Sequence, residues 1–405
     1  MFPSLAPVKV ESHTQPKSRI GSVDSLRGLV MVIMALDHVR EFFHAGAMSF
    51  QPEDLTRTTV ALFFTRWITH ICAPVFMFTA GLAAFFWLGR GRTTGELSRF
   101  LWKRGIWLVV LELTVLRFAM NFSLTNGVVI LSILWALGWS MVALGFLVRL
   151  PIRILAIVSV LVIALHNLAD PLQASQFGAA AWLWNVLHQP GVFRAGSALV
   201  VAAYPLVPWF AVMAAGFCFG PVMSLEPARR RQWMIRLGLG MTVAFLLIRG
   251  INIYGDPTRW SHQATPVLTV LSFLRCTKYP PSLDFLLMTL GPALLLLAAF
   301  ERFTLSKTSP LTVFGRVPLF YFLVHFFVAH LLTIPLALLR YGHAAFLLNP
   351  LPSIGGAPDS YPPGFGYSLP AVYLIWIAVV ALMYPLCLWF ARLKERRNDW
   401  WLSYL

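Results

Sequence analysis

Two residues in one apolar stretch combine a fixed positive charge with a titratable ring. Arg27 and His38 lie eleven residues apart in the segment SVDSLRGLVMVIMALDHVRE, which starts at Ser22. On an α-helix this spacing makes three turns plus about 20°, so both side chains share a face, about 16 Å apart. Ionisable groups inside a membrane helix cost about 2.5–3.5 kcal/mol each and therefore usually have a function. Imidazole suits general base catalysis near neutral pH, and guanidinium suits phosphates or a developing oxyanion.

Three further histidines are candidates for the same chemistry. His70 follows Arg66 by four residues in RWITHICAPVFMFTAG, and His325 follows Tyr321 by four in FGRVPLFYFLVH. Residues four apart share a helix face. His44 lies at the end of the first apolar stretch, in or next to the following loop. Placed by depth in the predicted helices, three imidazoles from three helices are expected to line one cavity in the middle or outer half of a membrane.

The remaining charges near these groups predict structural pairing. Asp37 adjoins His38, but sequence neighbours on a helix do not face each other, so we expect no His–Asp dyad. Asp37 is instead expected to form an ion pair with Arg40, Arg66 or Arg117, because charges within a bundle pair with one another. The residues predicted to bind a donor or to supply structural charge are Arg27, Asp37, Arg66, Arg316 and Tyr321.

The elements that must position these groups are membrane helices. The chain has 405 residues, of which 58% are hydrophobic and only 12% are charged. This composition is typical of a polytopic membrane protein and excludes an ordinary soluble domain. We predict an all-α bundle of about ten transmembrane helices as one domain (21–395) between two cytoplasmic tails (1–20 and 396–405). The predicted spans are 25–45, 58–88, 105–120, 127–148, 152–168, 197–220, 233–250, 283–300, 311–338 and 369–391.

The distribution of positive charge predicts the orientation. With both termini inside, 21 of the 32 Lys and Arg residues fall on the cytoplasmic side, as the positive-inside rule requires. The net charge of +16 therefore indicates membrane topology and not nucleic-acid binding. The four cysteines are far apart and mostly lie in apolar runs, so we expect neither disulfides nor a metal site. The longest predicted outer segment, 251–281, could contain a re-entrant piece.

Five segments resemble one enzyme family. They are SVDSLRGL followed by DH, RWITHICAPVFMFTAG, AYPLVPWFAVMAAG, TKYPPS with LDFLLMTLGP, and FGRVPLFYFLVH. They resemble the transmembrane acyltransferases, more narrowly the bacterial relatives of the lysosomal heparan-α-glucosaminide N-acetyltransferase, and the Arg27–His38 spacing is similar to that of the wider acyltransferase-3 group. The resemblance implies a multi-pass protein of the bacterial inner membrane. It also implies transfer of acetyl groups from cytoplasmic acetyl-CoA to a glycan or amino sugar outside. A homodimer is a possible assembly that the sequence leaves undecided.

The resemblance also implies roles for residues of this chain. Arg27, His38 and His325 match motif positions of the family. Some eukaryotic relatives have an asparagine at the position of His38 and an acidic residue at that of His70, and keep a candidate catalytic histidine after the first helix, where this chain has His44. The base is therefore His38, His44 or His70, and N- and O-acetylation both stay open. Arg27 is expected to hold the inner part of the donor. The basic segments around Arg90–Arg104 and Arg229–Arg231 are candidates for its phosphates.

A transporter or flippase for a glycan or lipid precursor is the alternative function. Its buried His, Arg and Glu residues would then form a proton relay or a substrate path. No inverted repeat, the usual mark of such transporters, is visible in the sequence. An activity that depends on coenzyme A would separate the two functions.

Overall fold

The computed structural model of the protein describes residues 20–124, 127–303, 305–349, 351, 356–397 and 399–403. Nearly all of the predicted N-terminal tail, and positions 398 and 404–405 of the predicted C-terminal tail, lie outside the described residues. Helices make up 72% of the structure and strands 5%, which confirms the helical class. Six described helical segments are long and apolar enough to cross a membrane, and two shorter apolar helices accompany them. The count of ten spans and the orientation stay predictions.

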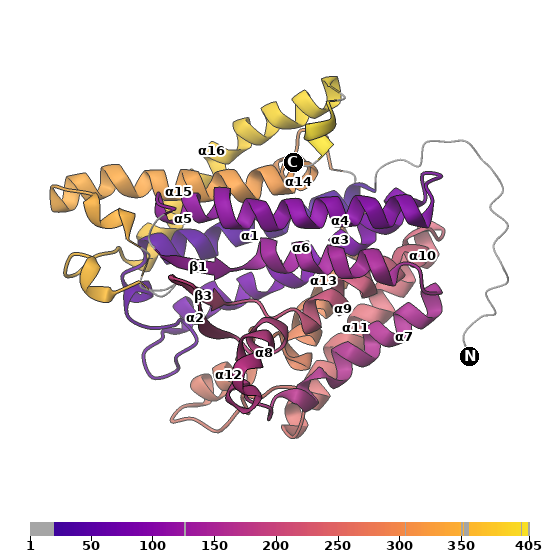
Figure 1. The fold of residues 1–405 in the computed structure, drawn as a ribbon, viewed down its shortest axis with the longest axis horizontal. Coiled ribbons are helices and arrows are strands. Elements are labelled where there is room, and N and C mark those ends of the chain that lie inside the picture. Colours follow the sequence, from indigo (N-terminus) through magenta and orange to yellow (C-terminus); the bar gives the residue numbers. More distant parts are fainter. Residues whose placement is uncertain are drawn as a thin grey trace.

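The first helix, α1 (Gly21–Phe43), is the centre of the bundle (Figure 1). Most of its length is buried, including charged residues near both ends. Because of these charged residues, α1 is not among the six helices that are apolar enough to cross a membrane by composition. The helices that contact it are α3 (Cys72–Leu88), α13 (Leu283–Phe300), α14 (Pro310–Arg316), α15 (Pro318–Tyr341) and α16 (Leu369–Arg396), together with the short α2 (Val60–Trp67).

The second predicted span is interrupted just before Pro74. It consists of α2 (Val60–Trp67), a 3₁₀ turn (Ile68–Ile71) and α3. Proline has no N–H for the carbonyl of residue 70 and its ring crowds that carbonyl, so the preceding turn tightens. The tightened turn contains His70.

The third predicted span begins earlier than its hydrophobicity indicates. Helix α4 spans Thr94–Leu111 and is followed by a π-helical turn and by α5 (Arg117–Asn121). A capping box fixes the start: Thr93 Oγ1 accepts from Glu96 N at 3.2 Å, and the Glu96 carboxylate accepts from Thr93 N at 2.8 Å. The predicted start at residue 105 was wrong because the basic first half of α4 was assigned to a loop.

A three-stranded sheet corrects the all-α prediction. Strand β1 (Val128–Leu131) pairs in parallel with β3 (Ala198–Ala202), and β2 (Gly191–Ala195) pairs antiparallel with β3. Residues 128–131 and 198–202 were both predicted to start membrane helices. Their sequences, VVIL and ALVVA, are rich in β-branched residues, and a short apolar run does not distinguish a buried strand from a helix.

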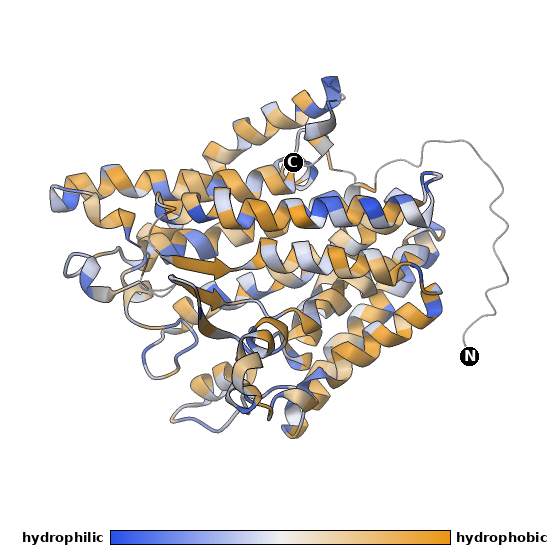
Figure 2. Cartoon of the chain, in the orientation of Figure 1, coloured by the Kyte–Doolittle hydropathy of each residue, from blue (hydrophilic) through white to orange (hydrophobic). Residues whose placement is uncertain are grey.

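The remaining helices complete the bundle and its outer cover. After each misassigned strand the expected helix follows, as α6 (Ile133–Leu147) and α9 (Val207–Cys218). Figure 2 shows apolar residues along most helices and hydrophilic residues in loops and in part of α4. The other helices are α7 (Ile152–Leu165), α8 (Ala181–Leu187), α10 (Gly220–Met223), α11 (Pro227–Ile251) and α12 (Pro266–Leu274). Helix α12 lies within 251–281, the segment for which a re-entrant piece was left open.

Several helix pairs touch backbone to backbone at glycines, and two of these contacts involve α1 and α3. A Cβ on Gly28 of α1 would lie 1.8 Å from the carbonyl oxygen of Leu311 in α14. A Cβ on Gly216 of α9 would lie 1.9 Å from the carbonyl oxygen of Phe78 in α3. Small residues permit such close approach in membrane bundles, so any side chain at these positions would force the helices apart.

Candidate active site

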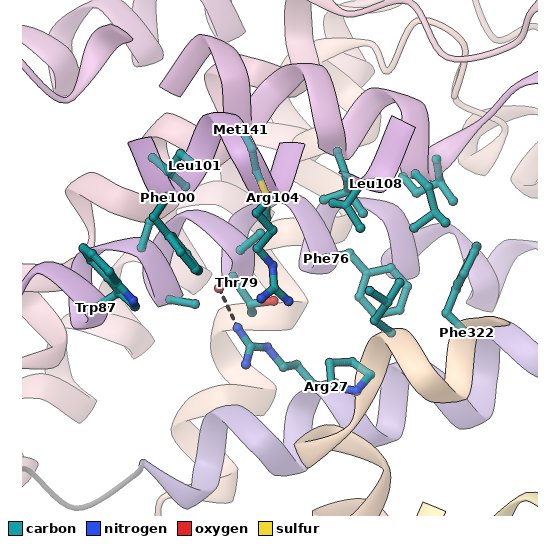
Figure 3. A pocket seen from close by; sticks show the side chains of 18 of the residues that line it. Arg27, Phe76, Thr79, Trp87, Phe100, Leu101, Arg104, Leu108, Met141 and Phe322 are labelled. Carbon is teal, nitrogen blue, oxygen red and sulfur yellow. Dashed lines mark hydrogen bonds between the residues drawn. The ribbon is translucent and has the colours of Figure 1, made fainter. Parts of the chain in front are cut away.

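An inner cavity of about 320 Å³ lies between α1, α3, α4, α6 and the start of α15. Its walls are mostly apolar, with Phe76, Trp87 and Phe100 among them (Figure 3). Among the described residues that line it are three arginines and no acidic side chain. The arginines are Arg27, Arg90 and Arg104. An apolar space with an excess of guanidinium groups is suited to an anionic ligand that also has a long uncharged part.

Two of these arginines point into the cavity from opposite helices. Arg27 on α1 donates from Nη2 to the carbonyl oxygen of Thr79 at 2.6 Å (Figure 3). Arg104 extends toward the same space from α4 (Figure 3). Trp87 and Phe100 stack on each other beside them, with ring centroids 4.8 Å apart. Arg27 thus lies where the sequence predicts a donor-binding cation, and Arg90 and Arg104 come from the basic segment proposed for phosphates.

An outer cavity of about 40 Å³ adjoins the inner one. Phe76, Ile133 and Phe322 line both cavities, so these three side chains form the partition between them. The outer cavity differs from the inner one in having titratable groups on its walls. Its other described lining residues are Met34, Asp37, His38, Thr69, Cys72, Ala73, Tyr204 and Lys278.

Two of the predicted histidines meet at the outer cavity. His38 Nδ1 lies 2.7 Å from His325 Nε2, and His325 Nδ1 lies 3.0 Å from the carbonyl oxygen of Tyr321. A carbonyl oxygen only accepts, so His325 Nδ1 carries a hydrogen. In a neutral His325 ring, Nε2 then accepts and His38 Nδ1 donates. This chain of donors leaves the lone pair of His38 on Nε2, and His38 is the member of the pair that lines the cavity.

The wall beside His38 is a network of paired charges. Asp37 accepts from Arg66 and, at 3.1 Å, from Arg40, two of the three partners predicted for it. Arg66 also donates to Glu53 at 3.0 Å. Glu53 lies in the loop before α2. Burial alone would raise the pKa of its carboxyl, but the Arg66 guanidinium and the hydrogen bond from His70 hold that pKa well below its ordinary value.

The structure separates the other two candidate bases from His38. His70 Nε2 lies 3.2 Å from Glu53 Oε1, and its ring packs against Phe285. His44 Nδ1 accepts from Gly46 N at 3.1 Å in the turn after α1. Burial, together with the charge of Arg40, lowers the pKa of His44. Neither imidazole is among the described residues that line the two cavities.

Two further predicted residues have structural contacts. Tyr321 is fully buried, and its carbonyl orients His325. Arg316 forms an ion pair with Glu395 of α16. Among the described residues, no group of three or more His, Cys, Asp or Glu side chains is placed to hold a metal ion.

The sequence did not assign roles to two residues of the outer cavity. Lys278 and Tyr204 line it beside His38. Both lie in segments that were singled out only for their resemblance to the family. Tyr204 lies in the short connection between β3 and α9, whereas Lys278 belongs to a long segment that reaches α1 from more than 200 residues away. Spacing within one helix cannot reveal such a contact.

Comparison with known families gives one match. The model of the catalytic domain of heparan-α-glucosaminide N-acetyltransferase matches residues 19–254, more than half of the chain. This stretch contains Arg27, His38 and the arginines of the inner cavity, whereas Lys278 and His325 lie beyond it. No curated protein matches the chain.

Proposed function

The chain belongs to the family of the heparan-α-glucosaminide N-acetyltransferase catalytic domain, and we propose that it transfers acetyl groups across a membrane. In this proposal the donor is cytoplasmic acetyl-CoA, and the acceptor is a glycan or amino sugar at the outer face. The observation that supports it most is the pair of adjoining cavities, one with three arginines and one with His38.

The inner cavity fits the donor by charge and by shape. Coenzyme A has phosphates at one end and a long, largely uncharged arm that ends in the thioester. Arg27, Arg90 and Arg104 would bind phosphates through charge-assisted hydrogen bonds. The apolar wall would take the arm and lead the acetyl group toward the partition formed by Phe76, Ile133 and Phe322.

The histidine pair supports a direct transfer mechanism. The amine or hydroxyl of the acceptor attacks the thioester carbonyl while His38 Nε2 takes its proton, so that a tetrahedral intermediate forms. The C–S bond then breaks, the carbonyl is restored on the acceptor, and the imidazolium returns the proton to the leaving thiolate. His325 accepts from His38 Nδ1 and so holds the ring with Nε2 toward the cavity. A positioned base contributes about 10²–10⁴-fold.

The two sides of the membrane follow from the basic loops. The segment that contains Arg90 and the basic half of α4 is cytoplasmic in the predicted orientation. The inner cavity would then open toward the cytoplasm, where the donor is made. The loops that follow α1 and α12 would lie outside, where the acceptor arrives.

The test is transfer by the purified full chain in proteoliposomes. Radiolabelled acetyl-CoA is supplied on one side, D-glucosamine is the probe acceptor, and labelled product and free thiol are both measured. We expect labelled product and equal thiol release. Binding of acetyl-CoA without any transfer would support acetyl-CoA as the donor and would exclude D-glucosamine as an acceptor. Absence of both binding and transfer would favour the transporter.

A further inference from the structure

Lys278 brings a positive charge into the outer cavity from a distant loop. It lines this cavity with His38 and Asp37. It lies between α12 and α13, and its Nζ is 5.2 Å from the centroid of the Tyr279 ring. Among the described residues that line the outer cavity, Lys278 is the only lysine or arginine. A cation in so small a space faces whatever charge develops there.

The neighbouring hydroxyl and thiol groups already have acceptors. Thr69 Oγ1 donates to the carbonyl oxygen of Arg66 at 2.7 Å. Cys72 Sγ donates to the carbonyl oxygen of Val30 at 3.6 Å. The ionised carboxylate of Asp37 can only accept. Three polar residues of this wall are therefore unsuited to stabilise a new negative charge.

Tyr204 is the other group able to donate into the cavity. The hydroxyl of Tyr279 donates to that of Tyr204 at 3.4 Å. The Tyr204 oxygen acts as the acceptor in this contact, so its own hydrogen remains available to donate. Lys278 and Tyr204 thus approach the cavity together, one charged and one neutral.

The turn that carries Lys278 is closed and anchored. Ser282 N donates to the carbonyl oxygen of Thr277 at 3.0 Å and so closes the turn. Asp256 holds both ends, because its Oδ2 accepts from Thr277 N at 2.7 Å and from Ser282 Oγ at 2.6 Å. Charges that are fixed in place before the reaction stabilise a transition state best, since nothing has to reorganise.

A buried arginine fixes the base of the same loop. Arg249 on α11 is 1% exposed and lies 3.7 Å from Asp284 and 4.0 Å from Asp256. Its guanidinium donates to four backbone carbonyls of the segment between α11 and α13, at 2.7–3.2 Å. These carbonyls belong to Thr258, Ser272, Phe273 and Arg275. The loop is therefore a rigid support for Lys278.

We infer that Lys278 is a catalytic residue that stabilises the oxyanion of the tetrahedral intermediate, with Tyr204 as a second donor. The inference rests on the proposed acetyl transfer. When the acceptor attacks, the electron pair of the carbonyl double bond moves onto oxygen, and the ammonium of Lys278 neutralises it. When the C–S bond breaks, the pair returns and Lys278 is unchanged. Asp256 acts through the loop as a positioning residue.

A purely structural role for Lys278 would be to balance Asp37. That carboxylate already has Arg66 and Arg40 as direct partners, and these two arginines also contact Glu53 and Glu41. The two roles differ in what they affect: loss of a counter-ion lowers stability, whereas loss of an oxyanion donor lowers kcat and leaves substrate binding in place.

The test compares Lys278→Met and Lys278→Arg with Lys307→Met, which removes an exposed lysine outside both cavities. The purified chain is assayed with acetyl-CoA and D-glucosamine, and thermal unfolding is measured in parallel. We expect Lys278→Met to lower kcat about 10²–10³-fold, as for loss of an oxyanion donor, with both KM values within about threefold. Lys278→Arg should keep part of the rate, and Lys307→Met should match the wild type.

Asp256→Asn tests whether the loop positions Lys278. It also tests the role of Lys278 if Lys278→Met does not fold. Its kcat should fall less than that of Lys278→Met, and the double variant should be no slower than Lys278→Met alone, because one residue acts through the other. A folded Lys278→Met with kcat within about threefold of the wild type would overturn the inference alone, as would unchanged kcat in Asp256→Asn. Absence of transfer by the wild type would overturn the proposed function as well.

Discussion

The inner and outer cavities contain charges of two different kinds. Three arginines line the inner cavity with no acidic residue among its described walls. Beside the outer cavity, the carboxylates of Asp37 and Glu53 are paired with Arg66 and Arg40 through direct contacts. A network of paired charges stabilises a structure by itself, whereas like charges around an apolar space repel one another. The difference teaches that the outer charges contribute to the fold, whereas the inner charges give their cavity a positive potential.

The largest effect is expected from the base. His38→Gln removes the Nε2 lone pair from the outer cavity, so kcat should fall about 10²–10⁴-fold while acetyl-CoA affinity stays close to that of the wild type. Transfer kinetics and equilibrium binding of acetyl-CoA measure the two quantities. Equal losses in kcat and in acetyl-CoA affinity would contradict the assignment of donor binding to the inner cavity and of base catalysis to the outer cavity.

Two further histidine variants sharpen this result. His325→Gln should lose less than His38→Gln, because it disturbs the orientation of the base and not the base itself. His44→Gln is the matched control, since His44 caps the turn after α1 and should keep nearly full activity. Full activity of His38→Gln together with an inactive His44→Gln would place the base in the outer loop.

A smaller effect is expected from the arginines of the inner cavity. Arg27→Met or Arg104→Met removes a charge-assisted contact worth about 1.5–3 kcal/mol, which corresponds to about 10–100-fold weaker binding of acetyl-CoA. Isothermal titration measures it, with the exposed Arg302→Met as control. The affinity of the wild type should also fall as salt rises, and that of the variants should fall less steeply. Unchanged acetyl-CoA affinity in both variants would mean that the donor does not bind in the inner cavity.

Glu53→Gln should reveal how the outer wall depends on pH. The variant loses the ion pair with Arg66, so it should unfold more easily by about 1.5–3 kcal/mol at neutral pH. Because the folded-state pKa of Glu53 lies below its ordinary value of 4.5, this stabilisation is complete above pH 4.5 and is lost as the pH falls further. Thermal unfolding of both proteins from pH 7 to pH 3 measures the gap, which should narrow on acidification. A constant gap would contradict the assigned ion pair.

The smallest effect is expected at the partition. Phe76→Ala enlarges the passage between the cavities. The ratio of kcat/KM for propionyl-CoA to kcat/KM for acetyl-CoA should therefore rise. One methylene in an apolar pocket discriminates between substrates by about 10–200-fold. We expect the ratio of the two kcat/KM values to change by an amount at the lower end of that range, about 10-fold. Phe219→Ala, which removes a buried phenylalanine away from both cavities, controls for loss of packing. An unchanged preference would mean that the partition does not select the acyl group.

The helix pattern was predictable, and the contacts between distant segments were not. Arg27 and His38 could be placed on one face because helical periodicity fixes directions within one element. The partner of His38 also followed a motif, since His325 lies on a regular helix. Lys278 could not be assigned, because its approach depends on the Arg249 and Asp256 contacts of a long loop. Strands β1 and β3 were missed because short apolar runs do not reveal which backbone they adopt.

The two glycine contacts described in the fold have a mechanical consequence. At Gly28 and at Gly216 the backbones of α1 and α14, and of α3 and α9, touch without intervening side chains, so the two helices of each pair pack closely as one unit. The inner cavity lies along the seam between these pairs, with Arg27 on α1 facing Thr79 on α3. In the proposed function, a donor larger than the cavity would enter by movement between these two helix pairs, and such movement would break the hydrogen bonds from Arg27 to Thr79 and from Cys72 to Val30.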